Sequence, residues 1–391
     1  MVLNGLTEST LAEVCTLVTD GTHDTPKRVT SGFPLIKAKE ITGGRIDFES
    51  CDQISEEEHI EVIARSKPDF GDTLFAHIGA SLGEAAFVNT TREFSIKNIA
   101  LFKPNPAIIN ARYLYYLVIS PAFQSLAKGT KTGSAQPFLG LSQLRSHRIE
   151  YHRDLATQRS IGAILSAYDD LMENGQKRIK ILEAMARTLY REWFIRENFP
   201  SNKRDNSFRK STFGDLFVLV KEPFAEKLHN DRPLLDLSRM PQHSLAPELT
   251  GKASELTTSR ILFEPGDTLF GAIRCYLHKV VAVHFRGVTN TSVLVLRPKK
   301  ECFRSLAAII ASDKETIRWA DTHSTGTKMP VINWGVFQTM PAPLPSDVLA
   351  ERFESIAGPM LEQIGILSTQ IQNLRHTRDL LLPRLLSGQV N

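Results

Sequence analysis

The feature that most constrains the fold of this chain is a pentapeptide that occurs twice. Gly-Asp-Thr-Leu-Phe stands at Gly71–Phe75 and again, 195 residues later, at Gly266–Phe270. An isoleucine follows each copy in the same register, as Ile78 and Ile273. Self-similarity at a fixed offset indicates one structural unit written more than once. We therefore predict a tandem duplication across the chain.

A second pair of segments supports the duplication. Gly133–Pro137 (Gly-Ser-Ala-Gln-Pro) corresponds to Gly326–Pro330 (Gly-Thr-Lys-Met-Pro) at an offset of 193 residues. Gln158-Arg159 and Glu351-Arg352 continue the correspondence at that same offset. A protein built from two similar halves can bind a ligand that is itself two-sided.

Bulk composition places the chain among ordinary globular proteins. Its 391 residues suggest two or three domains, and 42% hydrophobic with 23% charged residues is a typical globular balance. No apolar run approaches the ~18 residues of a membrane span, and the amino terminus lacks a secretory signal pattern. The scattered cysteines form no Cys-x-x-Cys pair. We expect a cytoplasmic protein with reduced thiols and no membrane contact.

The net charge of +4 and the pI near 8.8 are compatible with nucleic-acid binding. Proteins that bind nucleic acid mainly by electrostatics usually carry denser basic stretches. If DNA is the ligand, part of the phosphate neutralisation is therefore expected to come from a partner protein.

Two segments have the pattern of mixed α/β domains with many short elements. Turn residues alternate with strand-like runs from about residue 11 to 150, and the pattern returns from 213 to 345. The predicted strands are Thr73–Ile78, Ala85–Val88, Ile99–Phe102, Thr268–Ile273, Lys279–His284 and Ser292–Leu296. The predicted helices in these segments are Ala111–Ser120 and Phe303–Ser312.

Two further stretches have the heptad pattern of coiled-coil helices. Between about Thr157 and Asn198 there is no proline, and apolar residues hold two heptad positions over five heptads. One position is occupied by Ile161, Tyr168, Gly175, Leu182 and Leu189, and the other by Leu165, Met172, Ile179, Ala186 and Trp193.

The carboxyl-terminal stretch from about Asp347 repeats this pattern. Its two positions hold Phe353, Met360, Leu367, Leu374 and Leu381, and then Ala357, Ile364, Ile371 and Leu385. Arg378 interrupts the second stripe. Because interior proline costs a helix ~3 kcal/mol, we expect a kink or a fresh start near Pro359.

These segments predict an α/β (mixed α+β) chain with a pseudo-twofold internal repeat. Two globular domains, 1–155 and 201–345, would alternate with two long helices, 156–200 and 346–391. At ~1.5 Å per residue each helix would reach roughly 60 Å. Antiparallel pairing would place the two domains at opposite ends of a rod. The alternative is that each helix packs only on its own domain.

The sequence holds no recognisable catalytic motif. A phosphate-binding loop, a dinucleotide fingerprint, His-Glu-x-x-His and Gly-x-Ser-x-Gly are all missing. The tetrapeptide of DNA amino-methyltransferases is also missing, since the nearest segment, Asn105–Ile108, does not match. We therefore predict no catalytic residue, no metal site and no cofactor in this chain.

The repeat and its helices resemble a known family. Leu182–Phe194 (Leu-Glu-Ala-Met-Ala-Arg-Thr-Leu-Tyr-Arg-Glu-Trp-Phe) and Arg378–Gly388 (Arg-Asp-Leu-Leu-Leu-Pro-Arg-Leu-Leu-Ser-Gly) are similar to the two conserved helices of type I restriction-modification specificity (S) subunits. The doubled Gly-Asp-Thr-Leu-Phe is similar to the strand motif of that family's target-recognition domains. The resemblance covers essentially the whole chain.

The resemblance implies that each target-recognition domain reads one half of a split, asymmetric site in double-stranded DNA. The helices would set the distance between half-sites, about one to two DNA turns of ~34 Å. They would also dock two methyltransferase (M) subunits, which restriction (R) subunits join. S-adenosylmethionine, ATP and Mg²⁺ would belong to those partners. Two alternatives stay open, namely the recognition portion of a single-chain restriction-modification enzyme and a coiled-coil scaffold without DNA function.

Candidate DNA contacts are long polar side chains in loops, because these can reach base edges or phosphates. In the first domain they are Thr22, His23, Lys27, Arg28, His77, Ser81, Lys128, Lys131, Ser134 and Gln136. In the second they are Arg274, Tyr276, Lys279, Thr325, Thr327, Lys328 and Asn333. An ordinary solvated loop is the competing interpretation for each of them. Tyr190, Trp193 and Phe194 are candidates for partner docking, with packing inside the chain as the alternative.

Overall fold

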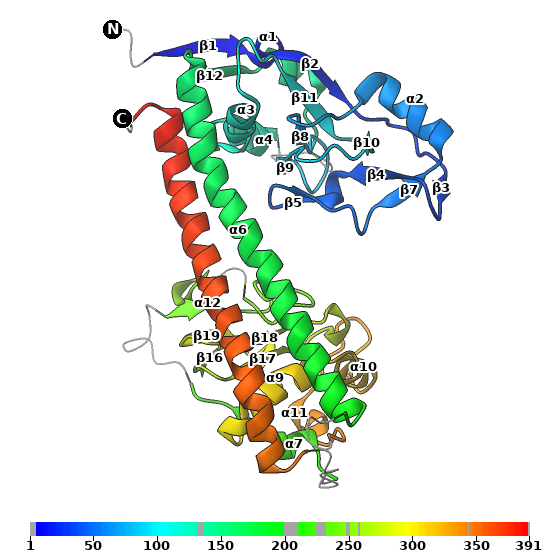
Figure 1. Cartoon of the computed structure of the whole chain (residues 1–391), viewed down its shortest axis with the longest axis vertical. Helices are drawn as coiled ribbons and strands as arrows, with labels where there is room; N and C mark the ends of the chain where they lie inside the picture. Colours follow the sequence, from blue (N-terminus) through cyan, green and yellow to red (C-terminus); the bar gives the residue numbers. More distant parts are fainter. Residues whose placement is uncertain are drawn as a thin grey trace. The chain divides into compact units, whose positions relative to one another are not determined.

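The computed structural model describes residues 5–130, 137–198, 210–223, 232–247, 251–256, 259–342 and 344–389. Its contacts divide the chain into two compact units. The first unit comprises Met1–Asp170 with His376–Asn391, and the second comprises Leu171–Arg375. Two long helices, α6 (Leu155–Tyr190) and α12 (Asp347–Leu386), each contribute residues to both units. Figure 1 shows the elements in order along the chain.

The first unit contains two four-stranded sheets. One has the order β2-β11-β8-β9 and is antiparallel, and the other has the order β10-β4-β7-β3 with β10 and β4 parallel. The strands of the first sheet are β2 (Cys15–Asp20), β11 (Ala100–Pro104), β8 (Thr73–Phe75) and β9 (Ala85–Phe87). Those of the second are β10 (Ser95–Lys97), β4 (Phe33–Lys37), β7 (Asp52–Ile54) and β3 (Arg28–Val29).

Shorter elements complete the first unit. Strand β1 (Leu6–Thr10) pairs with β12 (Arg148–His152), and β5 (Ile41–Thr42) pairs with β6 (Arg45–Ile46). The helices are α1 (Leu11–Val14), α2 (Glu56–Ser66), α3 (Ala111–Ile119), α4 (Pro121–Thr130) and α5 (Leu141–Ser146). The rings of Phe75, Phe102 and Phe123 pack together in the buried core of this unit.

The second unit repeats this arrangement. Its antiparallel sheet has the order β13-β20-β17-β18, and its other sheet, β15-β14-β19-β16, again contains one parallel pair, β14 with β19. The strands are β13 (Phe217–Val220), β20 (Val293–Pro298), β17 (Thr268–Gly271), β18 (Val280–Ala282), β15 (Gly251–Lys252), β14 (Pro233–Leu234), β19 (Gly287–Asn290) and β16 (Arg260–Phe263). The helices are α7 (Phe213–Leu216), α9 (Arg304–Ala311), α10 (Lys314–Thr322) and α11 (Trp334–Phe337). The predicted α/β fold with an internal repeat is confirmed.

Each copy of the repeated pentapeptide builds part of its unit's framework. In both copies the Thr-Leu-Phe residues form the strand that lies inside the antiparallel sheet, β8 or β17. The aspartates are buried: Asp72 accepts a hydrogen bond from Lys103 Nζ at 2.6 Å, and Asp267 accepts two from Arg297 at 2.7 and 2.8 Å. Both aspartates also cap the preceding turn by accepting a backbone N–H. The pentapeptide therefore carries structural residues.

The predicted strands and helices are present, with shifted ends. Strand β8 ends at Phe75, three residues before the predicted end, because Ala76 N–H already donates to Glu84 across a turn. The predicted helices Ala111–Ser120 and Phe303–Ser312 are α3 and α9, each one residue shorter at its carboxyl end. Helix α9 also starts one residue later, after a short 3₁₀ turn.

One of the two heptad stripes in each of α6 and α12 is buried at all of its apolar positions, and the other stripe is buried in part. Leu165, Met172, Ile179, Ala186 and Trp193 are all at most 6% exposed. In the second unit, Gly175 lies against Ile371 and Trp193 packs edge-on against Phe353 with centroids 5.9 Å apart. Residues later in α6 thus contact residues earlier in α12, so the two helices pair antiparallel in this unit. In the first unit, Ile161 and Leu165 share the core with the last turns of α12.

The expected fresh start of a helix near Pro359 is wrong. Helix α12 is continuous from Asp347 to Leu386, through Pro359 and Pro383. Pro359 and Ser355 are both exposed, so the backbone carbonyl that loses its usual N–H partner is on the solvent side. Water can satisfy that carbonyl, and the helix does not need to end.

Arg378, which interrupts the second apolar stripe, has a half-buried ionic partner in the first unit. Its Nη1 donates to Asp169 Oδ1 at 2.6 Å, and Asp169 Oδ2 accepts from the Tyr116 hydroxyl at 2.6 Å. Burial opposes the charge on Arg378, but the carboxylates of Asp169 and Asp379 more than offset it and raise the pKa of the guanidinium. The one charged residue in this apolar stripe of α12 therefore forms an ion pair with α6 within the first unit.

Among the described helices, none is long and apolar enough to cross a membrane.

Candidate nucleic-acid interface

Each unit places an equivalent turn after its repeated strand. In the first unit the turn spans 76–84, and in the second it spans 271–279. The same backbone bonds close both turns: Ala76 N–H donates to Glu84 O at 2.7 Å, and Gly271 N–H donates to Lys279 O at 2.9 Å. Both turns are also anchored to a later segment, because Gly79 N–H donates to Pro137 O and Arg274 N–H donates to Pro330 O. We call these two segments the reading turns.

The reading turns have the same backbone shape but different side chains. Gly79 has φ +78° and its counterpart Arg274 has φ +53°, while Gly83 has φ +100° and its counterpart His278 has φ +52°. Left-handed backbone costs glycine little and disfavours other residues. The second unit therefore keeps non-glycine residues at two positions where the first unit uses glycine.

In the second unit several predicted residues lie on or beside the reading turn. Arg274 and Tyr276 are exposed, and Lys279 is partly buried with its Nζ donating to Leu237 O at 2.7 Å. Thr325, Thr327 and Lys328 are exposed. Asn333 is exposed but caps α11 by accepting from Val336 N–H at 3.0 Å.

An open depression of about 450 Å³ brings Arg274 and Lys279 together. Its lining also includes Asp236, Ser238, Asn290 and Met329. The prediction from sequence missed Asp236, Ser238 and Asn290. A signal was available, because Phe33–Lys37 (Phe-Pro-Leu-Ile-Lys) and Arg232–Asp236 (Arg-Pro-Leu-Leu-Asp) are a further pair of repeated segments that lead into this region.

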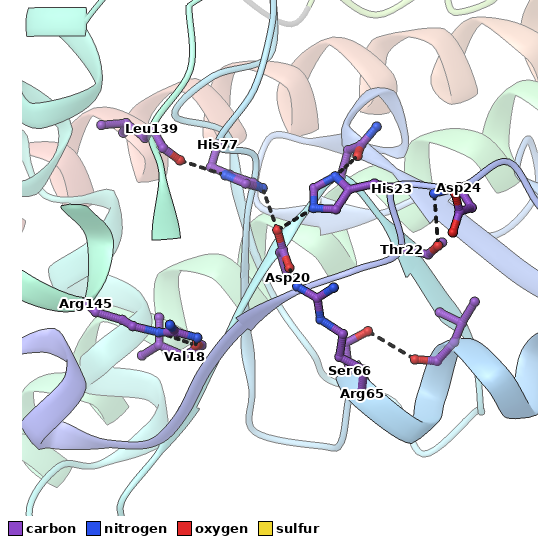
Figure 2. A network of polar contacts seen from close by, with 12 residues as sticks. Val18, Asp20, Thr22, His23, Asp24, Arg65, Ser66, His77, Leu139 and Arg145 are labelled. Carbon is purple, nitrogen blue, oxygen red and sulfur yellow. Dashed lines mark hydrogen bonds and ion pairs between the residues drawn. The ribbon is translucent and has the colours of Figure 1, made fainter. Parts of the chain in front are cut away.

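In the first unit the predicted residues Thr22 and His23 lie in a polar network around Asp20 (Figure 2). The Asp20 side chain is 4% exposed, and its carboxylate faces His23 Nε2 at 2.9 Å and pairs with Arg65 Nη2. His23 Nδ1 lies 2.9 Å from Asn98 Oδ1. Thr22 Oγ1 accepts from Asp24 N–H at 3.1 Å. The network fixes an exposed loop on a buried carboxylate.

His77 belongs to the inside of this network. It is 1% exposed, its Nδ1–H donates to Leu139 O at 2.8 Å, and its Nε2 lies 4.0 Å from Asp20 Oδ2 (Figure 2). Burial lowers the pKa of His77, although the Leu139 carbonyl and Asp20 oppose the shift. In this conformation the buried His77 ring stabilises the exposed loop from inside the unit.

The remaining predictions of the first unit are dispersed. Lys27 and Arg28 are exposed, and Arg28 Nε pairs with Asp52 at 3.1 Å. Ser81 is partly exposed in the reading turn. Lys128 lies on α4. Lys131, Ser134 and Gln136 lie outside the described residues.

Comparison with known proteins agrees with this geometry. The sequence model of the family described as "Type I restriction modification DNA specificity domain" matches residues 4–184. This match covers the first part of the chain and makes that part similar to the specificity domains of type I restriction-modification systems. Similar proteins occur in Methanocaldococcus jannaschii. The MjaIX specificity subunit is 25% identical over 91% of this chain and 89% of its own length, and the putative MjaX specificity subunit is 25% identical over 53% and 48%.

A solved structure has the same fold as this chain. The S subunit of a type I restriction-modification system from M. genitalium superposes with a TM-score of 0.62, covering 99% of this chain and 97% of that one. The two sequences are 14% identical, so the likeness concerns the fold.

The aromatic residues that were predicted to dock a partner pack within the second unit. Trp193 is 5% exposed, and both Trp193 and Phe194 contact Phe353. Tyr190 is partly buried against Phe194, with ring centroids 5.7 Å apart. Exposed apolar side chains on the same helical segment are instead Ile181, Met185 and Ile195.

No group of three or more His, Cys, Asp or Glu side chains suited to a metal ion occurs in the part of the chain that the structure describes.

We expect the buried histidines of this chain to make it less stable in mild acid. Burial lowers the pKa of His59, His77, His147, His278 and His284. The unfolded chain then takes up protons first as the pH falls below ~6.5, and each proton bound only by the unfolded state lowers the unfolding free energy by about 1.4 kcal/mol per pH unit. The melting temperature should therefore be lower at pH 5.5 than at pH 7.5.

His77→Asn tests one contributor. The asparagine amide can donate to Leu139 O as Nδ1 does, but it does not titrate. The gap between the two melting temperatures should shrink in this variant. An unchanged gap would show that His77 is not part of the effect.

Proposed function

We propose that this chain is the non-catalytic DNA-reading subunit of a type I complex, with each unit reading one half of a bipartite, asymmetric sequence. The observation that carries the proposal is the pair of reading turns. Their backbones are closed by equivalent hydrogen bonds, whereas their exposed side chains differ: Ser81 against Tyr276, and Glu84 against Lys279. Two turns with the same backbone structure and different exposed side chains are suited to contact two different half-sites.

The division between framework and surface supports this assignment. The aspartates that the two units share, Asp72 and Asp267, are buried, and each pairs with a partly exposed cation, Lys103 or Arg297. Residues that differ lie at exposed turns or around the depression of the second unit. Affinity for DNA depends on cations, while discrimination depends on side chains that reach base edges. The exposed polar groups here provide both classes.

The helices are proposed to dock two M subunits, which R subunits then join, and those partners would supply methylation and cleavage. Supporting this, exposed apolar side chains recur at matching heptad places in the second unit. Ile181 follows buried Ile179 by two residues, and Ile366 follows buried Ile364 by two. Exposed apolar side chains that recur along a helix face are typical of surfaces covered by partners. The domain limits 1–155, 156–200, 201–345 and 346–391 remain part of the proposal.

The test is co-expression with a methyltransferase subunit of a type I system from the same genome, followed by sequencing of methylated bases across the genome. A split motif with two unlike halves is expected. A contiguous motif, or none, would contradict the proposal. Replacing residues 1–155 with those of a relative should then change one half of the motif and leave the other half as it was.

A binding measurement separates this function from a scaffold. The chain alone should bind DNA weakly at physiological salt and gain site preference with its methyltransferase partner. Tight, site-specific binding that the partner does not alter would argue against a subunit that depends on shared phosphate contacts.

A further inference from the structure

We propose that Arg274 reads a guanine in the half-site bound by the second unit. This inference rests on the proposed function and assigns a base and a side chain to it. Arg274 lies in the reading turn, at the edge of the 450 Å³ depression. Four observations carry the assignment: its backbone, its unpaired guanidinium, its neighbours and its counterpart in the first unit.

The backbone of Arg274 is held in a conformation that glycine would adopt more easily. Its φ is +53°, and the first unit has Gly79 at the equivalent place with φ +78°. A non-glycine residue in this region marks local strain that the surrounding structure must sustain, and such residues gather at functional sites. Because the repeat shows that glycine suffices for the turn, the fold itself does not require the arginine side chain.

The guanidinium of Arg274 is available to a ligand. Arg274 is exposed, and no described residue forms a hydrogen bond or an ion pair with its guanidinium. Its backbone is fixed from both sides, since its N–H donates to Pro330 O and its carbonyl accepts from Leu277 N–H, each at 2.9 Å. A free guanidinium on a fixed backbone can be aimed with little loss of chain entropy.

The neighbours of Arg274 favour a hydrogen-bond acceptor as ligand. Asp236 is already engaged by Ser238 and by Arg239 Nη1 at 2.8 Å. Asn290 accepts Ser292 N–H through Oδ1 at 3.0 Å, which leaves its amide N–H groups as donors. Guanine offers two acceptors, O6 and N7, on its major-groove edge, and the two donors of a guanidinium match them. Adenine puts a donor at the corresponding place and would be rejected.

The first unit has no cationic side chain at the two equivalent positions of its own reading turn. Gly79 has no side chain, and the counterpart of Lys279 is Glu84. The first half-site is therefore not expected to be read by a cation from this turn. A change at Arg274 should alter one half of the motif only.

The experiment uses the specificity subunit assembled with its methyltransferase partner. Arg274→Gly restores the residue found in the first unit, so the turn is expected to fold, which a thermal melt verifies. Methylated-base sequencing should show one guanine position in one half-site become tolerant of other bases, with the other half unchanged. In binding assays the preference for that guanine, roughly ten- to a hundredfold for a bidentate contact, should fall to near unity.

Arg286→Ala is the matched control, because it removes one exposed arginine of the same unit that pairs with Glu264 and does not line the depression. Its motif should equal that of the wild type. If Arg274→Gly weakens binding to all sequences equally and leaves the motif intact, Arg274 contacts phosphate and the inference fails. An unchanged motif and affinity also overturn it. If the wild-type complex shows no split motif, the proposed function itself fails.

Discussion

Replacing Asp267 with alanine is expected to lower the unfolding free energy of the second unit by about 2–3 kcal/mol. This is below the cost of breaking a fully buried ion pair, because the Arg297 side chain is 42% exposed and stays hydrated. The Asp267 side chain is 1% exposed and holds three partners: two nitrogens of Arg297 and the backbone N–H of Glu264. Alanine would leave the Glu264 N–H and part of the guanidinium without acceptors. The loss should appear as a lower urea midpoint for the second unit.

Tryptophan fluorescence can report on this unit separately. All three tryptophans of the chain, Trp193, Trp319 and Trp334, lie within it. Arg318→Ala is the control, since it breaks an exposed pair with Glu315 and should cost no more than about 0.5 kcal/mol. A cost below about 1 kcal/mol for Asp267→Ala would mean that the repeated aspartate is not a framework residue.

Arg378→Leu is expected to lower the unfolding free energy of the first unit by about 2–3 kcal/mol, even though it completes the apolar stripe of α12. Removing one member of a buried pair leaves the other charge uncompensated, and Asp169 is 22% exposed. We place the cost below the fully buried range because water still reaches that carboxylate. Hydrogen exchange of α3, whose Tyr116 donates to Asp169, should become faster.

The double variant Arg378→Leu with Asp169→Asn should recover most of the loss, because asparagine carries no charge and can still accept from Tyr116. Asp379→Ala is the control for the second, exposed carboxylate near Arg378 and should change stability by less than about 0.5 kcal/mol. If Arg378→Leu stabilised the chain by itself, hydrophobic packing would outweigh the ion pair.

The repeat and the helix stripes were predictable because they depend on local, regular patterns. Gly-Asp-Thr-Leu-Phe is conspicuous since a buried strand and its capping aspartate tolerate few substitutions. The heptad positions were also readable, and the most buried set runs from Leu165 to Trp193. In contrast, the helix continues through Pro359 because the carbonyl that loses its N–H partner faces solvent. The heptad pattern alone did not show that this carbonyl would be exposed to water.

The second sheet of each unit was not predicted from the sequence. Its strands are as short as two residues, as in β14 (Pro233–Leu234) and β15 (Gly251–Lys252), and they depend on pairing between distant segments. The matching starts of the two units were overlooked as well. Ser9–Val18 and Ser211–Val220 each contain a one-turn helix with a capping box, Thr10 with Glu13 and Thr212 with Asp215. Conservative changes at the apolar positions hide this likeness.

Only part of the candidate interface could be predicted from the sequence, for a similar reason. The exposed residues of the second reading turn, Arg274 and Tyr276, were found because they follow the repeated strand. The depression needs Asp236 from the loop after β14 and Asn290 from β19, and the network of the first unit needs Arg65 from α2. Contacts between such distant segments depend on tertiary structure, which no local sequence pattern encodes.

The way in which the reading turns are closed has a consequence for how this protein can change over generations. The bonds that close and anchor them join main-chain atoms, for example Arg274 N–H to Pro330 O, so a side chain can change at turn positions outside the left-handed region without loss of those bonds. Tyr276 is exposed and is not one of the left-handed positions, so substitutions there are expected to leave the fold intact. Under the proposed function, a lineage can thus move between DNA preferences by single substitutions, without passing through an unfolded ancestor.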